Sequence, residues 1–472
     1  MLQTLKNAWN TKEIRSKILF TLLILLIYRI GSVIPVPFVD ADKFTGSFTG
    51  TVLDYMNTLS GGALSAMTLF ALGVQPYINA SIIIQLLAVV IPPLARWAKE
   101  DKKKMGYVTR ISTVILAVIT AIGYYFLLLN NGAVTAAARE GSLAWLYGIV
   151  IVVCYTAGAS LVMWLGERIN EKGIGNGISI ILFANIIASV PNFVITLVQF
   201  IWGTYFYQEN AWLFGIVSTV FGILLVAMLL ALIAFVIYVT GSERRIPVQY
   251  AKKVVGRKMY GGQSSNLPIK LNMTGVMPII FASSIVSFVP TIMQILESAG
   301  AYKSDSGWAV FADIIGSEGF VYPIMLFFLI IGFAYFYTQI TFDPIEVANN
   351  LKKQGGAIPG IRQGRPTADY IKKILGKITL AGALFLAFIS LLPMLLGPHV
   401  FKHLFQWIAE GQYMGTMYES SASYYAQSYA NSLTSIFTFG GTTILIVVGV
   451  AIETFRELEA QLTMRNYKGF LN

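Results

Sequence analysis

The sequence predicts an all-α integral membrane protein with ten transmembrane helices. Of its 472 residues, 56% are hydrophobic and only 12% are charged, which is too few charges to cover a soluble globule of that length. Apolar stretches of about 20 residues, long enough to cross a bilayer, recur along the whole chain. No soluble block longer than a loop separates them, so we predict a single membrane domain over residues 1–472.

The apolar stretches and the basic loops between them predict the order and orientation of the helices. Cationic loops stay in the cytoplasm, so the Lys and Arg counts give the orientation. Loops on one side of the predicted membrane hold 29 of the 34 Lys and Arg residues, which places both termini in the cytoplasm, with residues 455–472 as a tail. The spans are predicted at about residues 18–37, 75–93, 109–129, 143–165, 177–201, 213–239, 274–296, 321–340, 376–397 and 433–452.

A short stretch from Ser60 to Leu72, between the first and second spans, is rich in small side chains and too short to cross the membrane. It predicts a half-helix. Irregular backbone at membrane depth persists only where protein or a water-filled cavity surrounds it, so the half-helix indicates an internal cavity. The alternative interpretation is a helix that lies flat at the membrane surface.

An internal repeat links the second span to the seventh. The segments 73–83 and 275–285 share the pattern G-V-x-P-x-I-x-A-S-x-I, with seven identities in eleven positions. By the charge count the second span runs outside to inside and the seventh inside to outside, so the copies have opposite topology. Inverted repeats place a functional site at their interface near the midplane, often at interrupted helices. We expect Pro76 and Pro278 to create such interruptions. The alternative is a chance similarity between two apolar helices.

Two cytoplasmic loops, about 240–272 and 341–377, are long, basic and punctuated by Gly and Pro. A few residues suffice to join two helices, so their length indicates that something docks there. A basic surface suits either the phosphate backbone of RNA or an acidic protein face. The alternative is that these are solvated loops that only fix the topology.

Two other classes of membrane protein share some of these features. A multi-span secondary transporter would also fit inverted repeats, but it needs carboxylates or histidines at mid-membrane, and the ten predicted spans contain none there. An intramembrane enzyme needs a nucleophile with a base, paired aspartates or a metal set, which the spans also lack. We therefore predict no catalytic residue, no cofactor and no metal site, and keep the transporter as the alternative function.

Six stretches together resemble the SecY family of protein-conducting channels, and the similarity runs from about residue 15 to the end. The resemblance implies an hourglass channel of two inverted five-helix halves, about 15–201 and 213–454, in the bacterial cytoplasmic (inner) membrane. It also implies export of proteins across this membrane and their insertion into it. The stretches are Phe70–Leu87, Met163–Ser179, Arg244–Lys252, Asn349–Lys353, Ile358–Arg362 and Phe439–Ile446.

The resemblance further implies an apolar pore ring closed by a plug half-helix. A narrow apolar constriction sheds water and offers an ion nothing to replace its hydration shell, so such a ring holds back ions without any fixed charge. The implied ring residues are Val74, Ile78, Ile174, Ile178, Ile280 and Ile446. The implied plug residues are Gly61, Gly62, Ala63, Leu64, Ser65 and Leu69.

A lateral gate to lipid is implied between the second and third spans and the seventh and eighth. Polar side chains near this seam are expected to bond when it is shut, although ordinary helix packing explains them equally well; they are Gln85, Asn176, Ser283 and Ser284. The implied docking residues are Arg244, Arg245, Arg257, Lys258 and Arg362. The implied partners are the small subunits SecE and SecG, the motor SecA, the ribosome, signal sequences, unfolded polypeptides and membrane lipid.

Overall fold

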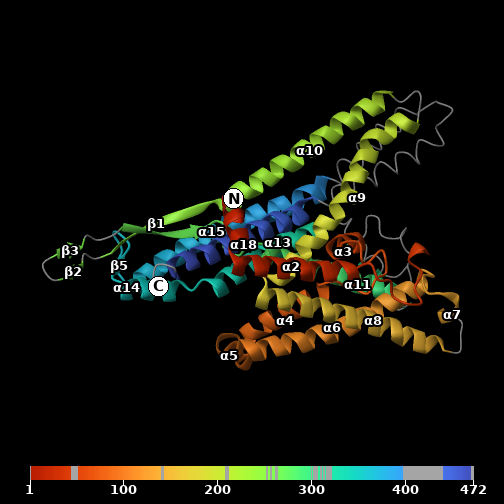
Figure 1. Ribbon diagram of the computed structural model, residues 1–472, viewed down its shortest axis with the longest axis horizontal. Helices are drawn as coiled ribbons and strands as arrows, with labels where there is room; N and C mark the ends of the chain where they lie inside the picture. Colours follow the sequence, from red (N-terminus) through yellow and green to blue (C-terminus); the bar gives the residue numbers. More distant parts are fainter. Residues whose placement is uncertain are drawn as a thin grey trace.

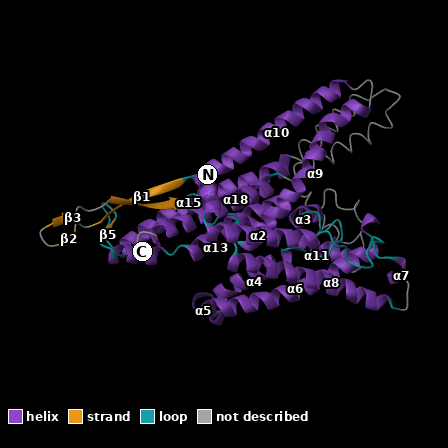
Figure 2. Ribbon diagram, viewed as in Figure 1, coloured by secondary structure: helices purple, strands orange, loops and turns teal. Residues whose placement is uncertain are grey.

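The computed structural model is dominated by long helices that run roughly along one direction (Figure 2). The structure describes residues 2–43, 52–139, 143–207, 212–250, 253–255, 258–260, 264–298 and 321–396, then 440–468, together with residues 300, 307, 308, 311 and 314. Figure 1 shows a small sheet at one end of the molecule and α3 and α7 toward the other.

Although residues 433–439 of the last one lie outside the described residues, each of the ten predicted spans overlaps a long helix. In chain order these are α2 (Lys12–Gly31), α4 (Gln75–Val90), α6 (Lys102–Asn130), α8 (Ala144–Lys172), α9 (Gly177–Tyr207), α10 (Trp212–Gly241), α11 (Met277–Ser298), α13 (Val321–Thr341), α15 (Arg365–Leu396) and α18 (Gly441–Lys468).

Seven helices in the described part of the chain are long and apolar enough to cross a membrane, and an eighth qualifies if a bent pair counts as one span. That pair is α4 and α5 (Pro92–Glu100), which meet at 115°. The bend follows from Pro92, because a residue before proline avoids the helical region, and Ile91 is indeed extended. The helices α2 and α18 fall outside this set. Charged residues occupy the first turns of α2, and the apolar part of α18 stops at Glu453.

Besides α5, five short helical elements in the described part of the chain connect or precede the long ones. They are α1 (Leu2–Asn10), the 3-10 turn η1 (Ala41–Lys43), α3 (Val52–Ser60), α7 (Ala136–Arg139) and α14 (Pro344–Lys353). The carboxylate of Asp343 caps α14 by accepting from the backbone N–H of Ile345 at 2.8 Å, which satisfies one of the orphan donors of the first turn.

The two long loops that are predicted to be cytoplasmic contain strands, so the all-α prediction is wrong in this region. Strand β1 (Glu243–Tyr250) pairs antiparallel with β4 (Ser264–Lys270), and β5 (Gly356–Ala357) pairs with the other edge of β1. Strands β2 (Lys253–Val255) and β3 (Lys258–Tyr260) pair with each other beyond this sheet. In Figure 1 the strands extend from the helices at one end, with α14 beside them.

The two loops form one folded unit with its own apolar core. Along β1 the side chains of Ile246 and Val248 are buried while their neighbours are exposed, the period-two pattern of a sheet with one covered face. These residues cluster with Ile269 of β4, Leu351 of α14 and Ile371 of α15. The strand β5 comes from the second loop, so backbone pairing joins the two loops directly.

Candidate functional site

The repeated motif marks the start of α4 and of α11, and it has the same backbone geometry in both copies. A glycine with positive φ precedes each helix, Gly73 at +54° and Gly275 at +64°. The proline is then the second helical residue, Pro76 in α4 and Pro278 in α11. The expectation that these prolines interrupt helices is wrong, because a proline in the first turn lacks only an N–H that has no partner there anyway.

Five of the six predicted ring residues lie in one buried cluster. They are Val74, Ile78, Ile178, Ile280 and Ile446, each at most 8% exposed. The two copies of the repeat contribute equivalent positions, because the N–H of Ile78 bonds to the carbonyl of Val74 at 3.1 Å and the N–H of Ile280 bonds to that of Val276 at 3.1 Å. The repeat therefore brings matching isoleucines from α4 and α11 into the same core.

The sixth predicted ring residue, Ile174, lies elsewhere. It belongs to a separate buried cluster with Ala8, Ile14 and Leu458, which joins the first two helices to α18. Its backbone N–H bonds to Thr21 Oγ1 at 3.2 Å. Ile174 occupies the turn between α8 and α9, before α9 begins. Its side chain therefore packs against α1, α2 and α18, and not in the cluster that contains the other five residues.

Two cavities border the buried cluster and identify a residue that sequence reasoning missed. The larger, of about 230 Å³, is lined by Ile78, Ile178 and Ile280, among others. The smaller, of about 10 Å³, is lined by Val74 and Leu182 together with the end of α3. Val74, which caps α4, and Ile78 are one turn apart, as are Ile178 and Leu182 of α9, so each of these two pairs has one member on each cavity. The i, i+4 spacing from Ile178 was the signal that could have identified Leu182.

The predicted plug residues form turns instead of a half-helix. The helix of this region is α3, which ends at Ser60, and residues 61–72 continue as turns; we call residues 52–72 the α3 segment. Gly61, Gly62 and Met67 have positive φ, which a continuing helix does not tolerate. Ala63 and Leu64 are buried, while Gly61, Gly62, Ser65 and Leu69 are half-buried.

The α3 segment is held by the chain that follows α2. The N–H of Val36 bonds to the carbonyl of Met67 at 3.0 Å, and the N–H of Leu69 bonds to the carbonyl of Ile34 at 2.9 Å. On α8, a side chain at Gly158 would collide with the carbonyl of Leu69, its Cβ lying only 1.9 Å away. A glycine is therefore required where α8 passes the segment.

A hydrogen bond crosses the predicted lateral gate. The hydroxyl of Tyr337 on α13 donates to Oε1 of Gln85 on α4, and Gln85 Nε2 donates to Ser81 Oγ at 2.8 Å. The ring of Tyr337 also packs against Phe281 of α11, with centroids 5.1 Å apart. Gln85 thus contacts α13 through Tyr337, a residue that the sequence pattern did not indicate.

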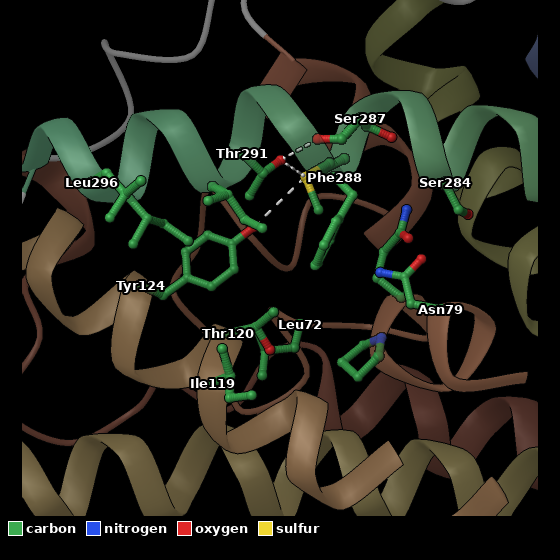
Figure 3. Close-up of a pocket in the computed structure, with 15 residues that line it drawn as sticks. Leu72, Asn79, Ile119, Thr120, Tyr124, Ser284, Ser287, Phe288, Thr291 and Leu296 are labelled. Atoms are coloured by element: carbon green, nitrogen blue, oxygen red, sulfur yellow. Dashed lines mark hydrogen bonds between the residues drawn. The ribbon is translucent and has the colours of Figure 1, made fainter. Parts of the chain in front are cut away.

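The other three predicted gate residues have different surroundings. Asn176 Oδ1 accepts from the N–H of Ile178 at 3.2 Å and so serves the start of α9, although Asn176 also lines the larger cavity. Ser283 donates to the carbonyl of Ile280 in its own helix at 3.1 Å. Ser284 lines a further cavity between α4, α6 and α11, shown in Figure 3.

That lateral cavity, of about 230 Å³, joins the gate helices to the α3 segment. Met56 of α3 projects its sulfur between α6 and α11, 3.8 Å from the hydroxyl of Tyr124 and 3.4 Å from that of Thr291. Figure 3 shows both hydroxyls directed at this sulfur. The close-up therefore shows a direct contact between the α3 segment and α11.

The predicted docking residues lie on the sheet and on the turn before α15. Arg244 and Arg245 are exposed on β1, and Arg245 pairs with Glu243 at 2.8 Å. Lys258 belongs to β3, and Arg257 lies outside the described residues. Nearby, burial lowers the pKa of Lys270 from its usual value, and the positive charge of Arg456 lowers it further.

Arg362 is exposed on a turn whose backbone is firmly held. Gly360 and Gly364 flank it with φ of +82° and +96°. Its carbonyl accepts from the hydroxyl of Thr367 at 2.8 Å, and Gln363 Nε2 donates to the carbonyl of Gly356 at 3.1 Å. The turn is thus tied to α15 and to β5, while the guanidinium points away from the core.

Comparison with known proteins agrees with this architecture. The family model described as SecY matches residues 68–455. A protein from Halalkalibacterium halodurans named "Protein translocase subunit SecY" is 40% identical over 478 residues, with full coverage of both chains. A solved structure described as "The structure of a protein conducting channel" matches with a TM-score of 0.59 and 17% identity, covering 94% of this chain and 92% of that one.

A second solved structure is described as "Sec61 in the Canine ribosome-channel complex from the endoplasmic reticulum". It matches with a TM-score of 0.57 and 17% identity, covering 94% of this chain and 92% of that chain. At this level of identity both structural matches support the fold.

Proposed function

The chain belongs to the SecY family, and from this premise we propose that it is the central subunit of a protein-conducting channel. It passes unfolded polypeptides across the membrane and releases apolar segments sideways into lipid. The observation that carries the proposal is the apolar cluster between two cavities, built from equivalent positions of an inverted repeat.

The proposed pore ring consists of branched aliphatic side chains that seal without a fixed charge. Its members are Val74, Ile78, Ile178, Leu182, Ile280 and Ile446, all buried in one cluster. Leu182 replaces Ile174 in this set, because Leu182 shares a cavity with Val74 and Ile174 packs among the termini. Such a ring yields to side chains of many shapes, and when it closes it gives an ion no ligand in exchange for water.

The proposed gate opens between α4 and α13, where Gln85 and Tyr337 meet. A hydrogen bond between membrane helices contributes only about 0.6 kcal/mol on average, so a hydrophobic signal segment that binds the open state better is able to part the seam. The α3 segment, proposed as the plug, contacts α11 through Met56. This contact connects the opening of the gate with the movement of the plug.

The proposed setting is the bacterial cytoplasmic membrane, with ten spans in two inverted halves and both termini in the cytoplasm. The basic residues of the strand-containing unit suit an acidic or phosphate-rich partner, so we propose the motor SecA and the ribosome as its ligands. The small subunits SecE and SecG are proposed as membrane partners. Arg244, Arg245, Arg257, Lys258 and Arg362 are the proposed docking residues.

The decisive experiment is purification in mild detergent, identification of copurifying small membrane subunits, and reconstitution into vesicles with an ATP-driven motor. We expect a signal-bearing precursor to become protected from added protease inside the vesicles. The proposal is contradicted if a precursor without a signal segment is protected equally well. It is also contradicted if protection does not exceed that in empty vesicles under conditions where a known family member exports the precursor.

A further inference from the structure

A buried amide lies in the first third of α9, next to Ile186 of the apolar cluster. Asn185 is 0% exposed, and its neighbours in the chain include the buried Ile186. An amide inside a membrane protein is costly unless hydrogen-bonded. Asn185 therefore needs hydrogen-bond partners, and α2 and α3 provide them.

The amide nitrogen of Asn185 ties α9 to α2 and α3. Nδ2 donates to the hydroxyl of Tyr28 on α2 at 2.9 Å and to the backbone carbonyl of Leu59 on α3 at 2.8 Å. Leu59 is in the last turn of α3, where carbonyls have no partner within the helix. Asn185 thus donates to a backbone carbonyl that has no hydrogen-bond partner within α3 itself.

The turn after α3 packs against the same amide. A Cβ built on Gly61 would lie 3.1 Å from Asn185 Oδ1 and 3.0 Å from Arg29 Nη1, so only glycine fits without displacement. Arg29 Nη1 also donates to the carbonyl of Gly61, at 3.4 Å. The side chains of Arg29 and Asn185 therefore both pack against the backbone of the α3 segment at Gly61.

The amide oxygen supplies a reason for the attachment to be reversible. Asn185 Oδ1 is buried and has no hydrogen-bond partner within the described residues. In the closed arrangement this oxygen forgoes a bond that water provides as soon as the α3 segment moves away. The cost of releasing the segment is reduced by that gain.

We infer that Asn185 is a latch for the α3 segment, holding residues 52–72 beside the apolar ring in the closed channel and releasing them on opening. The inference rests on the proposed function and adds to it a positioning residue. Asn185 acts by positioning the segment and has no proposed contact with the polypeptide that is exported.

The test compares resting ion conductance of reconstituted channels in planar bilayers without a client. Asn185→Ala removes one hydrogen bond to the segment, at the carbonyl of Leu59, and one to the hydroxyl of Tyr28 on α2, and we expect conductance to rise about fivefold. The matched control is Asn192→Ala, since Asn192 is exposed two turns further along the same helix. Conductance of Asn185→Ala equal to that of Asn192→Ala overturns the inference.

A second variant guards against general loss of structure. Tyr28→Phe keeps the ring, which stacks on Phe70 with centroids 5.3 Å apart, and removes only the hydroxyl. We expect a rise of about twofold to threefold from Tyr28→Phe. The double variant should be no leakier than Asn185→Ala, because the hydrogen bond that Tyr28→Phe removes is already absent from Asn185→Ala. Strictly multiplicative effects contradict a shared latch.

The same bilayers separate this inference from the proposed function. Ring variants at Ile78 and Ile280 report whether the chain forms the pore at all. If they leak and Asn185→Ala does not, the latch is wrong and the channel stands. If neither leaks, although both complexes are intact by size-exclusion chromatography, the proposed channel itself is wrong.

Discussion

The hydroxyl of Tyr337 on α13 donates a hydrogen bond to the side-chain carbonyl of Gln85 on α4. Gln85 is oriented for this by its own amide, which donates to Ser81 Oγ one turn earlier at 2.8 Å. The two helices come from opposite halves of the chain, and the bond borders the larger of the cavities beside the ring. Opening the proposed gate therefore requires this bond to break.

Removing the Tyr337 hydroxyl should make the gate open more readily. We expect Tyr337→Phe to export a precursor with a weakly hydrophobic signal segment about threefold faster, since one membrane hydrogen bond of average strength is lost. The measurement is the initial rate of protease protection in reconstituted vesicles. The control is Tyr335→Phe on the same helix, whose hydroxyl donates to the carbonyl of Gly376 on α15 and does not cross the gate. Equal acceleration by both variants contradicts a gate-specific role.

Shortening two facing ring residues should break the ion seal. In the double variant Ile78→Gly with Ile280→Gly, the equivalent positions of the repeat lose all their side-chain atoms and the constriction admits water. We expect a clear increase in resting conductance in planar bilayers. Glycine also weakens helices by about 1 kcal/mol, so the control carries the same changes at Ile83 and Ile195, which are exposed on α4 and α9. Leakage from the control to the same extent removes Ile78 and Ile280 from the ring.

The sequence alone was sufficient for the long helices and for most residues of the buried cluster that we propose as the ring. Long apolar runs identify membrane helices because few other structures satisfy every backbone group in lipid. The family resemblance indicated Val74, Ile78 and Ile280, and these residues fall on the two copies of the repeat. Ile174 was misplaced because it lies just outside α9, where a turn with positive φ at Gly175 redirects the chain. The direction of a turn depends on backbone torsions that residue identity indicates only weakly.

The sheet was missed for a different reason. In β1 only Ile246 and Val248 carry the period-two burial, and Pro247 lies between them, a residue that argues against a strand. The pairing partner β4 follows at a distance, and β5 comes from another loop of the sequence. Strands stabilised by such long-range pairing leave little local signal, because their stability comes from tertiary contacts with α14 and α15.

The reassignment on α9 is tested by a pair of single variants. We expect Leu182→Gly to raise resting conductance, because Leu182 lines the cavity beside Val74. Ile174→Ala should leave conductance unchanged and lower the stability by about 2 to 5 kcal/mol, the usual cost of truncating a buried aliphatic side chain. Thermal unfolding of the purified complex measures the second effect. Conductance that rises for Ile174→Ala and not for Leu182→Gly restores the original assignment.

Reversing the charge of Arg362 should impair motor-driven export without unfolding the channel. The guanidinium is exposed and forms no ion pair within the described residues, while the backbone of its turn is tied to Thr367 and Gly356. Arg362→Glu therefore changes the surface a motor meets and leaves the turn in place. We expect ATP-driven export to fall at least about tenfold, as for loss of a charge pair at a docking centre, with normal amounts of channel in the membrane.

Lys372→Glu makes the same charge change on an exposed face of α15 and should retain export. A parallel loss of export and of membrane-inserted protein in Arg362→Glu would instead assign Arg362 a role in folding.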